Sequence, residues 1–263
     1  MKKNENEFHK VKLKKNKSII KAIQILDLLA STSKGFYLSE ISSKLNINKA
    51  TTLRLLKTLE DEEFVERKGN LYFLGMRLFS IGNKVPIKRN IIDRVHPHLV
   101  KLAYKFNETA NLAELCFGSV DYLDKIETPR SLRISTYIGA KLPIHCTALG
   151  KAIMAFLPKE KREVILQDFY FERKTKNTIT DKKAFEEELK KIEKKGYSID
   201  NEEFEEGLRC VAVPLFIEDL NFYGAISLSA PSQRLPMEMI PEVAEVLKKE
   251  AELIEKEIKI KKI

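Results

Sequence analysis

The stretch Leu38-Ser-Glu-Ile-Ser-Ser-Lys-Leu-Asn-Ile-Asn-Lys-Ala-Thr-Thr-Leu-Arg-Leu-Leu-Lys-Thr-Leu59 decides the fold of the first part of this chain. Its first half places Leu38, Ile41 and Leu45 three and four residues apart, which predicts the apolar face of a helix. Asn46 suits a left-handed helix end. Asn48 suits the N-cap of a second helix, because its side-chain oxygen can accept a free backbone N–H. The pattern therefore predicts a helix-turn-helix.

The second helix is expected to turn leucines inward and a basic, hydroxyl-bearing face outward. The predicted inner residues are Leu53, Leu56 and Leu59. Cations that bind phosphate and guanine, together with short hydroxyl side chains, suit a helix that enters the DNA major groove. The candidate DNA-binding residues here are Asn48, Lys49, Thr51, Thr52, Arg54 and Lys57. The alternative is an ordinary helical hairpin whose basic face is solvated.

The flanking segments complete a winged-helix pattern. Two short apolar runs in 64–73 surround Lys68-Gly69-Asn70, which predicts a β-hairpin with a basic tip. Arg67 and Lys68 would contact phosphates from this wing, as Lys57 would from the helix. The isoleucines and leucines of 19–29 predict a packing helix in front. We therefore expect a winged helix-turn-helix domain at 17–75 and a linker helix at 76–90 of the kind that packs in dimers.

Composition and charge agree with a DNA-binding protein. Residues 1–90 contain 19 Lys and Arg against 9 Asp and Glu, whereas residues 91–263 contain 28 against 29. The excess positive charge therefore lies with the predicted winged helix, as expected of a nucleic-acid-binding region joined to a neutral domain. A lysine-rich tail used only for solubility would explain residues 1–16, which we expect to be disordered. It would not explain the cations within the motif.

The chain has the composition of a soluble globular protein, with 43% hydrophobic and 32% charged residues. No apolar run approaches the ~20 residues that a membrane span needs. The lysine-rich start lacks the apolar stretch of a secretory signal, so we expect a cytoplasmic protein. The three cysteines are odd in number and widely spaced, which favours reduced thiols over a disulfide framework.

Residues 91–263 predict an α+β domain with a largely antiparallel sheet. A helix at 87–106 precedes three strands, three helices at 148–157, 159–168 and 181–195, three further strands and a terminal helix at 241–260. The predicted strands are 112–117, 122–127, 132–138, 197–201, 211–217 and 222–229.

No strong catalytic constellation is present in this half. His145 and Cys146 with the distant Cys210 could act as a nucleophile and base, or as zinc ligands. Neither metal-ligand spacing nor a third orienting residue is visible, and a buried structural cysteine is the simpler interpretation. An enzyme of the hydrolase or metal-dependent type that uses Cys210 and His145 is the alternative to a regulator. We expect no cofactor and no metal site.

Two other segments have the character of a small-ligand pocket. Residues 139–152 run into a helix whose first turn has small side chains and free backbone N–H groups, which favours an anion such as a carboxylate. Asp200, Cys210, Ser227 and Ser229 could fix the orientation of a small polar ligand inside an apolar shell. The alternative is that these are satisfied polar groups at strand ends.

With both halves in view, the chain resembles the IclR-type (isocitrate lyase regulator) family of bacterial transcription regulators. The motifs that carry this resemblance extend over nearly the whole chain from about residue 17. They are Ala50-Thr-Thr-Leu-Arg-Leu-Leu-Lys-Thr-Leu59, Tyr72-Phe-Leu-Gly-Met-Arg-Leu78, Leu142-Pro-Ile-His-Cys-Thr-Ala-Leu-Gly-Lys-Ala-Ile-Met-Ala-Phe-Leu157, Asp200-Asn-Glu-Glu203, Gly207-Leu-Arg-Cys-Val-Ala-Val-Pro-Leu215 and Ala225-Ile-Ser-Leu-Ser-Ala-Pro231 with Arg234.

The resemblance implies a GAF-like effector-binding domain at 91–263 behind the winged helix. It further implies a homodimer or a dimer of dimers, with no membrane association, and small organic acids as effectors. The residues that match the effector pocket of the family are Ala148, Leu149, Asp200, Leu208, Cys210, Ser227 and Ser229. We therefore expect a cytoplasmic repressor whose binding to a double-stranded DNA operator is modulated by a small carboxylate. Glu63 departs from the glycine that is usual before the wing and resists positive φ.

Overall fold

The computed structural model describes residues 15–82, 84, 86–130 and 137–260, which form two compact units divided at residue 85. Each unit has its own apolar core. The expected disordered tail at 1–16 falls mostly on residues 1–14, and the expected strand at 132–138 falls mostly on 131–136, and these residues lie outside the described ones. Within the described residues, no helix is long and apolar enough to span a membrane.

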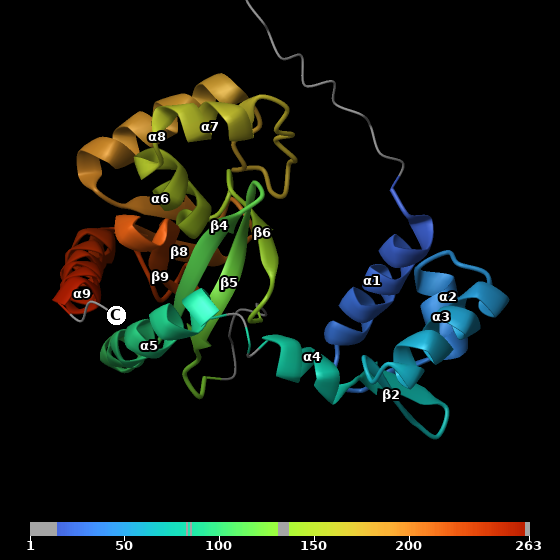
Figure 1. Ribbon diagram of the computed structural model, residues 1–263. Coiled ribbons are helices and arrows are strands. Elements are labelled where there is room, and N and C mark those ends of the chain that lie inside the picture. The colour runs from blue at the N-terminus through green and yellow to red at the C-terminus, as the bar shows by residue number, and fades with distance from the viewer. Residues whose placement is uncertain (1–14, 83, 85, 131–136, 261–263) are drawn as a thin grey trace, which may run out of the picture. The chain divides into compact units, whose positions relative to one another are not determined.

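The first unit is a winged helix-turn-helix (Figure 1). The antiparallel sheet has the strand order β1-β3-β2, and β2 and β3 form the expected hairpin. Its elements are α1 (Lys17–Ala30), β1 (Phe36–Tyr37), α2 (Leu38–Lys44), α3 (Lys49–Asp61), β2 (Val65–Lys68), β3 (Leu71–Leu74) and α4 (Met76–Gly82).

Asparagines set the helix ends of this unit. Asn16 caps α1 by accepting from the backbone N–H of Ser18, and Asn48 caps α3 by accepting from that of Thr51 at 2.8 Å. Asn46 takes a φ of 51° in the turn between α2 and α3, as its place in the sequence predicts. Glu63 takes a φ of 60° after α3. A non-glycine residue therefore occupies the left-handed region here, at some conformational cost.

The core of this unit corrects the predicted inner face of α3. Leu53 is 47% exposed, whereas Thr52 has no exposed surface. At 100° per residue, Leu53, Leu56 and Leu59 drift steadily around the helix, while Thr52, Leu55, Leu56 and Leu59 stay on one side. The buried residues of this core are Ile25, Leu29, Ile41, Leu56, Val65 and Tyr72.

Two helices of the first unit expose apolar side chains. On α1, Ile19 is 58% exposed and Ile23 is 51% exposed, so only part of the expected packing helix is buried. On α4, Met76 is 75% exposed and Phe79 is 65% exposed.

The second unit begins at Pro86 with α5, so residues 86–90 of the expected linker belong to this helix. Pro97 lies inside α5. The elements are α5 (Pro86–Phe106), β4 (Thr109–Cys116), β5 (Ser119–Ile126), β6 (Lys141–Pro143), α6 (Ala148–Phe156), α7 (Lys159–Leu166), α8 (Lys182–Lys195), β7 (Ser198–Asn201), β8 (Leu208–Ile217), η1 (Glu218–Leu220), β9 (Phe222–Pro231), η2 (Met237–Met239) and α9 (Ile240–Ile260).

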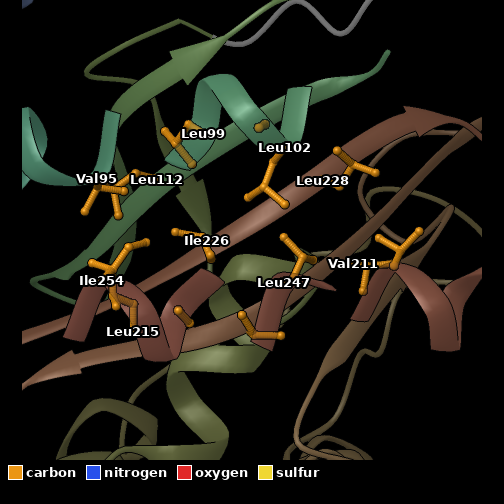
Figure 2. Packing of buried hydrophobic residues seen from close by; sticks show 14 of the residues in the cluster. Val95, Leu99, Leu102, Leu112, Val211, Leu215, Ile226, Leu228, Leu247 and Ile254 are labelled. Atoms are coloured by element: carbon orange, nitrogen blue, oxygen red, sulfur yellow. The ribbon is translucent and has the colours of Figure 1, made fainter. Parts of the chain in front are cut away.

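The sheet of this unit is antiparallel, with the strand order β6-β5-β4-β9-β8-β7. Helices α5 and α9 cover one face, and α6, α7 and α8 lie over the other (Figure 1). Leu99 of α5 and Leu247 of α9 pack against Val211 and Ile226 of the sheet (Figure 2). Leu253 departs from the expected inner face of α9, since it is 42% exposed. The fold is the expected α+β arrangement.

Strand alternation sorts the side chains of the sheet between its two faces. On β8 and β9, Val211 and Leu228 face α5 and α9, whereas Cys210 packs with α6. The register places Asp200 opposite Cys210 and Cys210 opposite Ser229. This alternation and register bring polar side chains from three strands together beneath α6.

Candidate functional site

The exposed face of α3 carries most of the predicted base-contacting cations. Lys49, Arg54 and Lys57 are exposed and Thr51 is half-buried. Leu53 also lies on this exposed face. A helical periodicity that takes Thr52, and not Leu53, as a buried position would have indicated this. An exposed face with cations and one leucine can contact phosphates, guanine and a thymine methyl group.

Thr52 is not available to contact a base, which corrects the prediction made for it. Its side chain is fully buried, and its hydroxyl donates to the backbone oxygens of Asn48 at 3.1 Å and of Ile47 at 3.5 Å. The hydroxyl therefore serves the turn that precedes α3. A threonine side chain beside its own backbone commonly makes such local hydrogen bonds.

The wing presents its two cations in contact with neighbouring groups. The Arg67 Nε donates to the backbone oxygen of Gly69 at 2.9 Å, and its guanidinium lies 5.6 Å from the ring centroid of Tyr72. Lys68 pairs with Glu66 at 3.2 Å. Both cations are exposed. Their contacts hold them near the tip of the hairpin, where a DNA backbone could reach them.

The second unit contains a small cavity beneath α6. All seven residues predicted for the effector pocket line it, from α6 and from strands β7, β8 and β9. Four more residues complete the lining, and residue type alone did not single them out. The lining residues are Tyr122, Leu142, Thr147, Ala148, Leu149, Asp200, Phe204, Leu208, Cys210, Ser227 and Ser229.

The N-terminus of α6 forms one wall of this cavity. Thr147 caps the helix, since its hydroxyl accepts from the backbone N–H of Gly150 at 3.1 Å. A side chain on Gly150 would place its Cβ 2.5 Å from the backbone oxygen of Ile144, so only glycine fits here. The N–H groups of Ala148 and Leu149 lie in the first turn, where no carbonyl of the helix can accept from them. They offer hydrogen bonds and a positive dipole end to an anion.

Asp200 brings an acidic group to the opposite wall. Burial, together with the nearby charge of Glu203, raises the pKa of the Asp200 carboxyl to about 7. One of its oxygens accepts from the backbone N–H groups of Glu203 at 2.8 Å and of Phe204 at 3.3 Å. Glu203 in turn pairs with the fully buried ammonium of Lys151. Near neutral pH, Asp200 can therefore carry a proton and donate it in a hydrogen bond.

The two serines of β9 provide further polar groups, held by a residue that the sequence did not reveal. The Asn111 side chain lies on β4, opposite Ser227 in the register. Its Nδ2 donates to the Ser227 hydroxyl at 3.1 Å and to the Ser229 hydroxyl at 3.2 Å. No local motif marks Asn111, because its importance comes from strand pairing across more than a hundred residues.

The alternative site around His145 and the cysteines does not assemble. His145 is buried between Phe169 and Phe171, and its Nε2 hydrogen-bonds the backbone oxygen of Glu172 at 2.9 Å. Burial lowers the pKa of His145, and burial raises the pKa of the Cys210 thiol well above its ordinary value. Cys210 lines the cavity, whereas His145 does not. Across the described residues, no group of three or more His, Cys, Asp and Glu could hold a metal ion.

Comparison with known proteins gives both units the same assignment. The IclR helix-turn-helix domain matches residues 18–69, and the C-terminal domain of the bacterial transcriptional regulator IclR matches residues 84–256. The transcriptional repressor IclR of Escherichia coli K12 is 31% identical over 89% of this chain and 87% of its own length. The regulator KdgR of the same organism is also 31% identical, over 88% of each chain.

Solved structures agree with this assignment. The crystal structure of the Thermotoga maritima IclR is similar with a TM-score of 0.74 and 34% identity, over 92% of this chain and 98% of that one. An IclR homolog from Microbacterium hydrocarbonoxydans, crystallised in complex with 4-hydroxybenzoate, is similar with a TM-score of 0.77. That homolog is 21% identical, over 92% of this chain and 99% of its own, so the likeness concerns the fold alone.

Proposed function

Because this chain belongs to the IclR family of bacterial transcriptional regulators, we propose that it is a cytoplasmic repressor that a small carboxylate releases from its operator or retains on it. The cavity beneath α6 carries this proposal, because it gathers all seven residues expected to bind the effector. Similar chains bear the names transcriptional repressor IclR and acetate operon repressor, which favours repression over activation.

In this proposal α3 enters the major groove. Lys49, Thr51 and Arg54 contact base edges, while Lys57 and the wing cations contact phosphates. The cap residue Asn48 fixes the end of α3 that approaches the bases. Leu53 adds an apolar contact suited to a thymine methyl group. Thr52 is left out of the contact surface because it is buried.

The effector in this proposal is a small organic acid held with its carboxylate at the first turn of α6. The N–H groups of Ala148 and Leu149 donate to one oxygen, and the serine hydroxyls of β9 are within the same enclosure. Leu208 and the neighbouring apolar side chains surround the rest of the ligand. The effector alters DNA binding only if it binds two arrangements of the protein with different affinity.

The protein acts as a homodimer or a dimer of dimers in this proposal. The exposed apolar faces of α1 and α4 support a dimer through the DNA-binding unit, because a solvated Phe79 or Ile23 costs free energy that a partner surface would recover. A two-fold dimer also suits a palindromic operator.

A gel shift on the DNA that flanks the gene of the protein tests the proposal, repeated with glyoxylate, pyruvate and 4-hydroxybenzoate as a carboxylate panel. We expect a shifted band at moderate salt whose intensity changes with at least one acid. Failure to bind any of these duplexes at moderate salt would remove the DNA-binding proposal. If the protein binds a duplex specifically, but none of the three acids changes that binding and none shifts the melting temperature of the protein, this effector class is removed.

A further inference from the structure

Asn111 is a buried residue whose amide nitrogen makes hydrogen bonds, whereas its amide oxygen makes none with the described residues. Its side chain is 1% exposed. The amide nitrogen donates to the hydroxyls of Ser227 and Ser229, whereas Oδ1 is buried with no hydrogen-bond partner among the described residues. Asn111 does not line the cavity itself. It therefore acts on the cavity through the two serines.

The direction of these hydrogen bonds follows from the two ends of the amide. A primary amide carries two N–H donors on nitrogen and a carbonyl acceptor on oxygen. With nitrogen toward the serines, both N–H groups are used and one carbonyl stays unpaired. The reversed amide would leave two buried N–H groups without acceptors, and orphaned buried N–H groups are rarer than under-satisfied carbonyls. The orientation with donating nitrogen therefore has the lower energy.

This direction decides what the serines offer to a ligand. A serine hydroxyl that accepts from Asn111 keeps its own proton to donate elsewhere. Neither hydroxyl donates to a carbonyl or carboxylate of the protein in the part of the chain that the structure describes; the Ser229 oxygen lies within hydrogen-bonding reach of the Cys210 thiol, a weak partner. The Ser227 proton is therefore left for the cavity, and the Ser229 proton has only the weak Cys210 thiol, which lines the same cavity, as a competing partner.

We propose that Asn111 is a positioning residue that turns Ser227 and Ser229 into hydrogen-bond donors and thereby sets the cavity to accept an oxyacid end of a ligand. The proposal deepens the proposed function, on which its ligand class rests. The second oxygen of a carboxylate, or a carbonyl beside it, would accept from the serines.

Neutron diffraction on the full-length deuterated protein tests the hydrogen-bond direction without any ligand. We expect both deuterons on the Asn111 Nδ2 to point at the serine oxygens, and both serine O–D bonds to turn toward the cavity. Serine deuterons that point at the Asn111 Oδ1 would overturn the inference. This measurement decides the matter even if no acid in the panel binds.

Substitution tests the consequence for binding, measured by calorimetry with the tightest-binding acid of the panel. Asn111→Asp cannot donate when ionised, so we expect its acid affinity, relative to the wild type at the same pH, to fall at least about 100-fold at about pH 8 and to recover partly near pH 5, where the new carboxyl group is protonated. The comparison is made at each pH because Asp200, which lines the cavity and has a pKa of about 7, changes charge over this range in both proteins. Asn111→Ala, which merely frees the serines, should weaken binding by about 10-fold.

Asn177→Asp is the matched control, because it adds the same charge to an exposed asparagine of the same unit, whose Nδ2 donates to the backbone oxygen of Asn201. It should leave acid affinity and its pH dependence unchanged. Equal acid affinity in Asn111→Asp and the wild type at about pH 8, or a loss without recovery at low pH in a variant that melts normally, would contradict the inference. If the wild type binds no acid, the proposed effector class fails, while the neutron result still decides the role of Asn111.

Discussion

The ammonium group of Lys151 pairs with the carboxylate of Glu203 in the interior of the second unit, where Lys151 has no exposed surface. Glu203 in turn lies beside Asp200, since its backbone N–H donates to the Asp200 carboxylate at 2.8 Å. Two buried ions that neutralise each other thus support the acidic wall of the effector cavity. Removing one partner would leave the other charged and unpaired, which is far more costly than removing both.

Lys151→Met should therefore lower the free energy of unfolding by about 3–5 kcal/mol, measured by urea denaturation. The double variant Lys151→Met with Glu203→Leu should recover much of this loss, because no buried charge is then left unpaired. Lys159→Met is the control, since the Lys159–Glu163 pair is exposed and should matter by less than about 1 kcal/mol. A double variant as unstable as the single one would show that the pair does not act as a unit.

Asp200 should make stability depend on pH. Its pKa in the folded protein, about 7, lies above the ordinary value of 3.8, because burial penalises the carboxylate. The folded state thus binds the proton more tightly than the unfolded state. The contribution of Asp200 to stability is fully present below about pH 4 and is lost as pH rises through about 7, a change on the order of a few kcal/mol.

Asp200→Asn should remove this pH-dependent loss of stability. In a plot of the urea midpoint against pH, measured between about pH 4 and pH 8, the fall of the midpoint with rising pH should be smaller than in the wild type. Asp168→Asn, which changes an exposed aspartate of the same unit, should leave the plot as in the wild type. Identical slopes for the wild type and Asp200→Asn would mean that Asp200 titrates normally.

Arg54→Ala should weaken specific operator binding by about 1–3 kcal/mol if the guanidinium contacts a guanine through two hydrogen bonds. Binding to random duplexes should change much less. Arg173→Ala removes the same charge from an exposed site in the second unit and should leave both affinities unchanged. Fluorescence anisotropy with matched specific and random duplexes measures this, and an unaltered ratio of the two affinities would exclude Arg54 as a base contact.

Thr52→Val should affect stability and not sequence preference. Valine keeps the shape of the side chain but loses the hydroxyl that donates to Asn48 and Ile47, so we expect a loss of about 1 kcal/mol in the free energy of unfolding. The ranking of operator variants should match that of the wild type. A changed ranking with unchanged stability would return Thr52 to the DNA-contacting surface.

The sequence predicts local structure here better than it predicts helix faces. Asn48 and Asn46 occupy the cap and turn positions that their chemistry favours, because both effects act within a few residues. Thr52 and Leu53 exchange the sides predicted for them. The buried side of α3 depends on which elements pack against it. A threonine whose hydroxyl donates a hydrogen bond to a nearby backbone oxygen can be buried there as readily as a leucine.

The cavity was foreseeable from family resemblance and only partly from the residues themselves. Asp200, Cys210 and Ser229 have polar character that suggests a site, but their proximity comes from pairing between strands. Asn111 gives no such signal, since a single asparagine in an apolar strand is ordinarily a satisfied interior residue. Tyr122 is missed for a similar reason, because its place beside the cavity comes from the pairing of β5 with β4 and not from a local motif.

The pairing of Asp200 with Cys210 and of Cys210 with Ser229 makes the effector cavity sensitive to the spacing of residues within strands. Deleting one residue from β8 ahead of Cys210 would send that thiol to the opposite face of the sheet and bring a valine to the ligand. Relatives can therefore acquire new effectors by exchanging side chains in place, whereas gaps and insertions in these strands would abolish ligand sensing altogether. Length variation in this lineage should accumulate in the connecting loops.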